Sequence, residues 1–582
     1  MLDEKQAESK NTVEEADVDP TAIFNSKKTL PYYNRPRFYK AHNTWCTEAI
    51  FEEVDLDQAG MRGKEQTKRC GRILVSSNGS QTTARYLPLG IFQKDGYGYF
   101  MFEILPEGSW SYEIEAGAND YDDHEIFLCL SGKTLADNAW YKTLRPNEIY
   151  KSEQVRIVGA KDLDELIEHT VKCKRNAKRK NTLNVHEQVV FNIFQQCCGP
   201  SPNEEKDAKW IPLVAEANAD YYVIDAGWFD NGSTHAVGIW DECKERYPSG
   251  LIKSVEKVRA KAMKFGLWIE PQSVGIHCAN KELLPEYCFF HINGVRTVCN
   301  GRYQLNYAYQ EVCDYADNIV KKLVDRYNVN YIKIDYNQTQ LGNDCQNGSY
   351  TEGLAEHIRG YLQWFEKIQE KYPNVIFETC ASGGMWMDSN IGQYTTVYSA
   401  SDQGSYYNYP PILANLPFIV LPEQEGIWCI PVGGWKEEEC GTSNEQVIMN
   451  VINSLYGVMH LCSRIDRLTA EQKKLLAEGI GYYRELGKIK TEFVPVLPNG
   501  FARIDDAIVF TGGKTKEKLY ISVYNLAKES KVAIVDLSKY GVKNASLVYP
   551  KSAMNAYSLE NGVFSVTLDS MTARAFEFEI EK

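Results

Sequence analysis

The pattern of apolar and polar positions divides the chain into three regions. From about residue 30 to 155, runs such as 71–76 and 97–104 alternate apolar and polar side chains between Gly, Pro, Asn and Asp turns, which predicts a β-sandwich. From about 186, short apolar strands alternate with helical periods, and eight such units over roughly 300 residues predict a (β/α)8 barrel. Alternation returns from about 490, in 518–524 and 574–580, and predicts a small C-terminal β-sandwich.

The expected fold is therefore α/β, with a central barrel between two β domains. We expect a disordered tail over 1–20, which is acidic and poor in aromatics, the N-terminal sandwich and its connector over 21–180, the barrel over 181–490 and the C-terminal domain over 491–582. Helical periods over 311–327 and 353–372 lie between strands, and a helix over 469–486 follows the last one. The expected barrel strands are 189–194, 221–225, 265–270, 330–335, 375–379, 396–401, 418–421 and 458–461.

The connector, 160–180, carries a basic cluster over 171–180. Such a cluster could bind nucleic acid, but we interpret it as one solvated helix face.

The fourth expected strand has the most informative end. Side chains alternate along a strand, so Lys333, Asp335 and Asn337 share one face. An ammonium two residues away favours the ionised form of Asp335, as a nucleophilic carboxylate requires. The alternative is a structural Lys–Asp pair that closes the strand end.

Chemically capable residues also follow the other expected strands. The active site of such a barrel lies at the carboxyl ends of its strands, where Asp225, Glu270, Cys380 and Asp402 fall. Taken singly, Asp225 could cap a helix, Cys380 could be a packed thiol, 383–384 a tight turn and Asp402 the start of a turn. Two carboxylates on separate strands, without a metal triad, are the usual equipment of a retaining glycosidase. We therefore assign Asp335 as the nucleophile and Asp402, with no cation beside it in sequence, as the acid/base.

These motifs resemble those of the α-galactosidases (melibiases) of glycoside hydrolase family 36. Residues 333–337 resemble the family's Lys-Trp-Asp-Met-Asn, 266–271 its Gly-Leu-Trp-Phe-Glu-Pro, and 399–402 its Trp-Thr-Ser-Asp. The glycine-rich stretch 378–388 matches without a gap, and the similarity covers about 185–490. The resemblance implies the three-domain layout and the same catalytic pair.

The resemblance also implies a sugar subsite, which departs from the family pattern in several places. Arg302 could approach a sugar hydroxyl or could instead be a surface residue that pairs with a helix carboxylate. Ser382 replaces a family Gly near the expected sugar 2-substituent, and Ala226 replaces the second Asp of the family's Leu-Asp-Asp-Gly-Trp-Phe. The implied sugar-binding residues are Asp225, Trp228, Trp268, Arg302, Lys333, Asn337, Cys380, Ser382 and Gly383. The other departures are Gln195, Gln272, Trp386 and Ser399.

We expect a retaining, exo-acting α-glycosidase, an α-galactosidase for small α-galactosides that works through a covalent glycosyl-aspartate. The loss of one carboxylate at Ala226 fits a pentose or 6-deoxy sugar, such as a β-L-arabinopyranoside, better than a full galactose. Ser382 beside Cys380 leaves little room for the acetamido group of an α-N-acetylgalactosaminide. A raffinose-type galactosyltransferase and a non-catalytic sugar-binding protein are the remaining alternatives.

Composition excludes other classes of function. The net charge of −14, with no basic patch among aromatics, argues against nucleic acid. No apolar run approaches the ~18 residues of a membrane span, and no export signal is evident, so we expect a cytoplasmic protein. The 16 cysteines lack metal-ligand spacing, and we read 197–198 as two reduced thiols. We expect no metal or cofactor, and a sugar as the partner; a homo-oligomer is left open.

Overall fold

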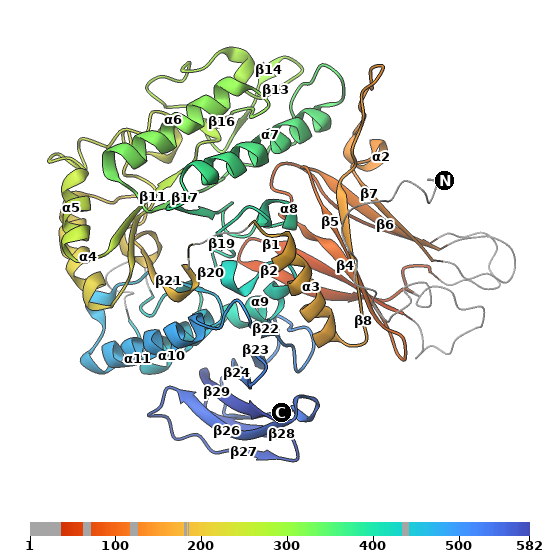
Figure 1. Cartoon of the computed structure of the whole chain (residues 1–582), viewed down its shortest axis with the longest axis vertical. Helices are drawn as coiled ribbons and strands as arrows, with labels where there is room; N and C mark the ends of the chain where they lie inside the picture. The colour runs from red at the N-terminus through yellow and green to blue at the C-terminus, as the bar shows by residue number, and fades with distance from the viewer. Residues whose placement is uncertain are drawn as a thin grey trace, which may run out of the picture.

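The computed structural model describes residues 36–581, except 57, 62–70, 117–125, 180–182, 184 and 434–440. The tail expected over 1–20 lies outside the described residues. Figure 1 shows the N-terminal β domain beside the barrel and the C-terminal β domain, in blue, below it. The expected α/β fold, with a central barrel and two β-sandwich domains, is confirmed.

Eight parallel strands close the barrel in chain order, because the last strand pairs back onto the first through His460 and Val190. Apolar side chains at the amino ends of the strands, among them Val190, Tyr221, Tyr331, Ile376 and Val458, fill the floor of the barrel. The strands are β9 (Val190–Asn192), β10 (Tyr221–Ile224), β11 (Lys264–Ile269), β17 (Tyr331–Ile334), β18 (Ile376–Thr379), β19 (Val397–Ser399), β20 (Glu425–Cys429) and β21 (Val458–Leu461).

The seventh strand was predicted in the wrong place. Residues 418–421 are buried but not extended. The helix α9 (Tyr409–Asn415) leads into a short 3-10 turn, Leu416–Phe418, with Pro417 in its first turn. The strand is β20, which begins at the buried Glu425. Because the strand begins with a charged residue, it does not read as an apolar run in the sequence.

Helices cover the outside of the barrel. In α6 the buried residues recur every three or four positions, as in Val312, Ala316, Ile319 and Leu323, so one face of the helix packs inward. A capping box between Thr469 and Gln472 starts the last helix. The main covering helices are α4 (Glu204–Glu216), α5 (Ile252–Ala260), α6 (Gln310–Tyr327), α7 (Tyr350–Lys371), α10 (Asn444–Ser454) and α11 (Ala470–Gly487).

The N-terminal domain is a sandwich of two antiparallel sheets around an aromatic core that includes Phe38, Phe92, Phe102, Trp110 and Tyr112. Five strands form one sheet, in the order β2 (Thr47–Val54), β1 (Arg37–Thr44), β4 (Tyr86–Lys94), β5 (Gly98–Leu105) and β8 (Gln154–Ala160). Three form the other, in the order β3 (Arg72–Ser77), β6 (Trp110–Ala116) and β7 (Ile126–Gly132).

The basic connector is a helix, α3 (Leu163–Ala177), but the solvated-face interpretation is wrong for two of its residues. Lys174 is buried and donates to Glu103 of the N-terminal sheet, at 3.1 Å from Oε1. Arg175 pairs with Glu423 of the barrel at 2.9 Å. These charges join the two domains, because α3 lies between the sheet and the barrel.

The C-terminal domain is a second sandwich, with a core that includes Leu519, Ile521, Phe564 and Phe576. Its five-stranded sheet has the order β22 (Val494–Pro495), β23 (Ile508–Lys514), β24 (Lys518–Asn525), β29 (Thr572–Ile580) and β26 (Val542–Tyr549). Its three-stranded sheet has the order β25 (Lys531–Asp536), β28 (Val563–Leu568) and β27 (Tyr557–Glu560).

Within the described part of the chain, no helix combines the length and the apolar character needed to cross a bilayer. The described cysteines are free thiols, Cys197 and Cys198 among them.

Candidate functional site

Asp335 lies directly after β17 and is held by donors on both oxygens. Its Oδ2 accepts from the indole N–H of Trp268 at 3.0 Å and from the amide of Asn337 at 2.8 Å. Its Oδ1 accepts from two backbone N–H groups. Burial works against the charged form, but the Lys333 ammonium and these donors outweigh it and hold the pKa of Asp335 below its usual range. Asp335 is therefore ionised at neutral pH.

Lys333 points into the barrel but hydrogen-bonds a different carboxylate. Its Nζ lies 3.0 Å from Oδ2 of Asp225, which follows β10 and also accepts from Asn192 at 2.6 Å. The ammonium lies over the ring of Trp428, 5.3 Å from its centroid. Although burial lowers the pKa of Lys333, the charge of Asp225 raises it well above its usual range. One lysine thus supports two buried carboxylates.

Arg302 is buried, which excludes the alternative of a surface residue. It lies in β16 (Arg302–Gln304), is 3 % exposed and donates through Nε to Glu270 at 2.5 Å. The other Glu270 oxygen accepts the backbone N–H of Asn337 at 2.8 Å. Burial raises the pKa of Glu270 to about 7 in spite of Arg302. The pair fixes the loop that follows Asp335.

Asp402 lies beyond β19, at the junction with the N-terminal domain, and is half-buried. Its Oδ2 accepts from the indole N–H of Trp45 at 3.2 Å, and Trp45 lies in the turn between β1 and β2. Burial raises the pKa of Asp402, the negative charge of Asp335 raises it further, and Lys333 opposes them. The two carboxylates therefore differ in the way that a nucleophile and a proton donor require.

A tight turn connects the surroundings of the two carboxylates. Ser382 and Gly383 have positive φ angles of 51° and 76°, and a Cβ at Gly383 would lie 2.7 Å from the backbone N of Asp402. The Ser382 hydroxyl donates to the Asn337 side chain at 2.7 Å. Cys380, after β18, accepts the Gly383 N–H at 3.4 Å through its sulfur. Its thiol is neutral, because burial raises its pKa well above the usual range.

Trp228 was expected beside the sugar, but the structure places it behind Trp268. It is 0 % exposed, and its indole N–H donates to the backbone oxygen of Trp268 at 2.8 Å. Its ring packs edge-on against Tyr327 of α6. An aromatic cluster between strand and helix holds the ring there, so Trp228 supports the wall of the site and does not form its surface.

The residues that depart from the family pattern also lie near the strand ends. Ala226 is buried and its N–H donates to Oδ1 of Asp225 at 2.8 Å. Ser399 and Gln272 are buried, and the Ser399 hydroxyl has no hydrogen-bond partner among the described residues. Trp386 packs against Tyr336, with ring centroids 5.7 Å apart. Gln195 lies after β9, where its backbone oxygen accepts from the Cys462 thiol.

The sequence did not indicate Trp45 as a site residue. It precedes Asp402 by 357 positions in a different domain, and its stretch predicted only β-structure. It is 63 % exposed, so it lies at the open side of the site.

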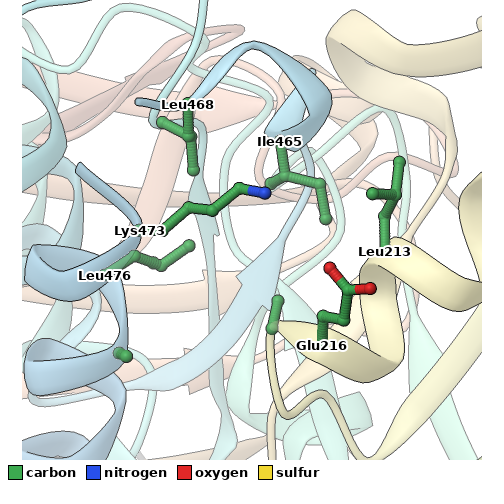
Figure 2. A pocket seen from close by; sticks show the side chains of 8 residues that line it. Leu213, Glu216, Ile465, Leu468, Lys473 and Leu476 are labelled. Carbon is green, nitrogen blue, oxygen red and sulfur yellow. The ribbon is translucent and has the colours of Figure 1, made fainter. Parts of the chain in front are cut away.

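In the described part of the chain, neither a metal-ligand cluster nor the small hollow in Figure 2 offers a competing site. Among the residues that the structure describes, no three His, Cys, Asp or Glu side chains are grouped to hold a metal ion. A hollow of about 60 Å³ between α4 and α11 has an apolar lining apart from Glu216 and Lys473 (Figure 2). It is far smaller than the roughly 300 Å³ of an ordinary small-ligand pocket.

Comparison with known proteins shows the family to which the chain belongs. The family model named melibiase matches residues 159–487. A probable α-galactosidase C of Aspergillus terreus is 24 % identical over 57 % of this chain and 46 % of its own length. The α-galactosidase Mel36A of Lactobacillus acidophilus is 26 % identical over 53 % of this chain and 42 % of its own. The chain thus matches about half the length of these relatives.

Solved structures show the same fold. One is an α-galactosidase AgaA variant of Geobacillus stearothermophilus in complex with raffinose. It superposes with a TM-score of 0.75 at 14 % identity, and the match covers 95 % of this chain and 76 % of the AgaA chain. The galactosidase domain of the α-galactosidase–sucrose kinase AgaSK gives a TM-score of 0.71 at 18 % identity, over 94 % and 74 %.

Proposed function

Because the chain belongs to the melibiase family of glycoside hydrolases, we propose that it is a retaining, exo-acting α-galactosidase for small α-galactosides. The observation that carries the proposal is the pair of unequal carboxylates at the strand ends. The pKa of Asp335 is lowered and that of Asp402 is raised, each by a cause visible in its surroundings. A solved relative of the same fold holds raffinose, an α-galactoside.

The proposed reaction has two steps. The Asp335 carboxylate attacks the anomeric carbon while the bond to the leaving oxygen breaks and Asp402 gives that oxygen its proton. A covalent glycosyl-aspartate results. The Asp402 carboxylate then takes a proton from water, whose oxygen attacks the anomeric carbon and releases Asp335.

The surrounding residues have distinct proposed roles. Trp268 and Asn337 hold Oδ2 of Asp335, and two backbone N–H groups hold Oδ1, so the carboxylate is fixed in one orientation for attack. Asp225 and Lys333 form a polar pair toward the carboxyl ends of the strands, which can recognise hydroxyls of the sugar. Trp45, exposed beside Asp402, lies where the leaving group must depart.

One observation favours a second candidate for the sugar. The buried Ala226 brings no carboxylate next to Asp225, where the family pattern has a second Asp. A pentose or a 6-deoxy sugar, which lacks one hydroxyl, needs one acceptor fewer. A β-L-arabinopyranoside or an α-D-fucoside is therefore the alternative substrate, with the mechanism unchanged.

The test is turnover of para-nitrophenyl glycosides, with azide added to each catalytic variant. The panel holds the α-galactoside, α-N-acetylgalactosaminide, β-L-arabinopyranoside, α-D-fucoside and α-glucoside. We expect the wild type to turn over the α-galactoside. Asp335→Ala with azide should give a β-glycosyl azide, because azide attacks the anomeric carbon from the face that the Asp335 carboxylate has vacated. Asp402→Ala with azide should instead give the α-azide, formed from the intermediate. Asp241→Ala, at a side chain 55 % exposed, is the control.

Other outcomes have defined meanings. Turnover of another sugar alone reassigns the substrate and keeps the mechanism. Transfer to an added sugar acceptor in place of water identifies a galactosyltransferase. Binding without turnover of any glycoside identifies a sugar-binding protein and overturns the proposal.

A further inference from the structure

Glu48 is a fully buried carboxylate that the proposed mechanism does not use. It lies at the start of β2, three residues after Trp45, and is 0 % exposed. Its Oε2 accepts from the hydroxyl of Ser401 at 2.5 Å, although Ser401 lies 353 positions later. Its Oε1 accepts from the backbone N–H of Cys46 at 3.1 Å. One side chain thus contacts both the Trp45 turn and the segment that carries Asp402.

These contacts belong to a closed set of hydrogen bonds around Asp402. The Ser401 hydroxyl accepts from the backbone N–H of Gln403 at 3.0 Å. The Gln403 side chain in turn donates to the backbone oxygen of Cys46 at 2.7 Å. Of the two neighbours of Asp402, Gln403 is therefore bound directly to the turn that carries Trp45, and Ser401 is bound to it through Glu48.

Gly384, which follows the tight turn at Ser382 and Gly383, packs against Glu48. A Cβ at Gly384 would lie 2.4 Å from the Ala400 oxygen and 3.1 Å from Cγ of Glu48. Asn43 and Thr83 of the N-terminal domain donate to the Gly384 oxygen at 3.0 and 2.9 Å. The Gly384 backbone is therefore packed closely against Glu48 and against Ala400, the residue before Ser401.

We propose that Glu48 is a positioning residue for the acid/base: through Ser401 and the Trp45 turn, it sets the orientation of the Asp402 carboxyl. The inference rests on the proposed function, because it gives Asp402 a proton to deliver. Glu48 itself does not contact the sugar, since its side chain is covered on all sides. The N-terminal domain would thereby take a direct part in the geometry of proton transfer.

The electrostatics of Glu48 agree with this role. Its side chain has no ion-pair partner among the described residues, and the ionisable groups that face it are Asp402, Cys46 and Tyr409. Burial raises the pKa of Glu48 to about 8. Near neutral pH the Glu48 carboxyl therefore carries less negative charge beside Asp402 than an ordinary glutamate would.

The test compares Glu48→Ala, Glu48→Gln and Ser401→Ala with Glu52→Gln, at a half-exposed side chain of the same strand. Glu48→Gln keeps the shape and one of the two acceptor oxygens, so it should retain most of the activity. The two alanine variants should lose about 10- to 100-fold in kcat/KM on phenyl glycosides, which need the acid, and much less on 2,4-dinitrophenyl glycosides, which do not. An equal loss on both substrates, or no loss, overturns the proposal.

Hydrogen–deuterium exchange provides a readout that does not depend on turnover. In Glu48→Ala and Ser401→Ala, peptides over 43–49 and 399–405 should exchange faster, while Glu52→Gln should match the wild type. Unchanged exchange in both alanine variants overturns the proposal, even if Glu48→Ala alone folds poorly. If exchange responds as expected but the wild type turns over no glycoside, the connection between the segments stands and the proposed function fails.

Discussion

The ammonium of Lys333 hydrogen-bonds Asp225 at 3.0 Å, and not Asp335, its neighbour two residues along the chain. β11 lies between β10 and β17, so the contact passes over one intervening strand. Lys333 still acts on Asp335 through its charge, which helps to hold the pKa of that carboxyl low. A single cation therefore stabilises the negative charge of both carboxylates.

Replacing Lys333 should affect binding and nucleophilicity together. Lys333→Met leaves Asp225 buried without its cation, and an uncompensated buried charge costs about 3–5 kcal/mol. We expect kcat/KM to fall at least about 100-fold and the acidic limb of its pH profile to move to higher pH, because the pKa of Asp335 rises. Lys322→Met, at a lysine that pairs with Asp241 on the outside, is the matched control. An unchanged acidic limb would show that Lys333 serves Asp225 alone.

The pH profile of kcat/KM should be a bell. Asp335 must be ionised, so activity is lost as pH falls through its pKa, which lies below the ordinary Asp range. Asp402 must be protonated, so activity is lost as pH rises through its pKa, which lies above that range. Asp402→Ala, assayed on a dinitrophenyl glycoside, should lack the alkaline limb. Persistence of that limb would assign it to another group, with Glu270 the first to examine.

Ala226→Asp should shift the preference toward galactosides. The new carboxylate would lie beside Asp225 and could accept a sugar hydroxyl that now has no partner, a bond worth about 1–3 kcal/mol when buried. We expect the ratio of kcat/KM for the α-galactoside to that for the α-D-fucoside to rise roughly tenfold. Ala226→Asn, which adds similar bulk without the charge, is the control. Equal losses on both sugars would argue against a missing acceptor at this position.

Lys174→Met should weaken the attachment of the N-terminal domain. Lys174 and Arg156 both donate to Glu103, which is 0 % exposed, so removing the lysine leaves a buried carboxylate with one cation instead of two. We expect the free energy of unfolding to fall by about 3 kcal/mol, measured by urea denaturation. Lys172→Met, on the exposed side of the same helix, should have little effect. Equal stability of the two variants would show that Arg156 compensates alone.

Local patterns predicted most of the fold, and contacts between distant segments account for what they missed. Seven barrel strands were located because apolar runs recur between helical periods. β20 was missed because it begins with the buried Glu425. The cation that favours the charged form of this carboxyl, Lys490, is 65 positions away, and no local pattern connects the two residues.

The same holds for the site. Asp335 and Asp402 follow strands, so their place at one end of the barrel could be predicted. Trp228 also follows a strand, but Gly227, with φ of 105°, begins a turn, and the Trp228 ring packs among Phe229, Trp240 and Tyr327. Trp45 could not be predicted, because it reaches Asp402 through the arrangement of two domains.

The hydrogen bond between Trp45 and Asp402 cannot form during synthesis until both segments have left the ribosome. The turn that carries Trp45 leaves the ribosome 357 residues before its partner, and β9 must wait for β21 before the barrel can close. The N-terminal sandwich, with its own core, can fold while the barrel is still being made. A folded N-terminal domain would thus offer the Asp402 segment a ready surface to pack on, and we expect a nascent chain that stops before β21 to lack a closed barrel.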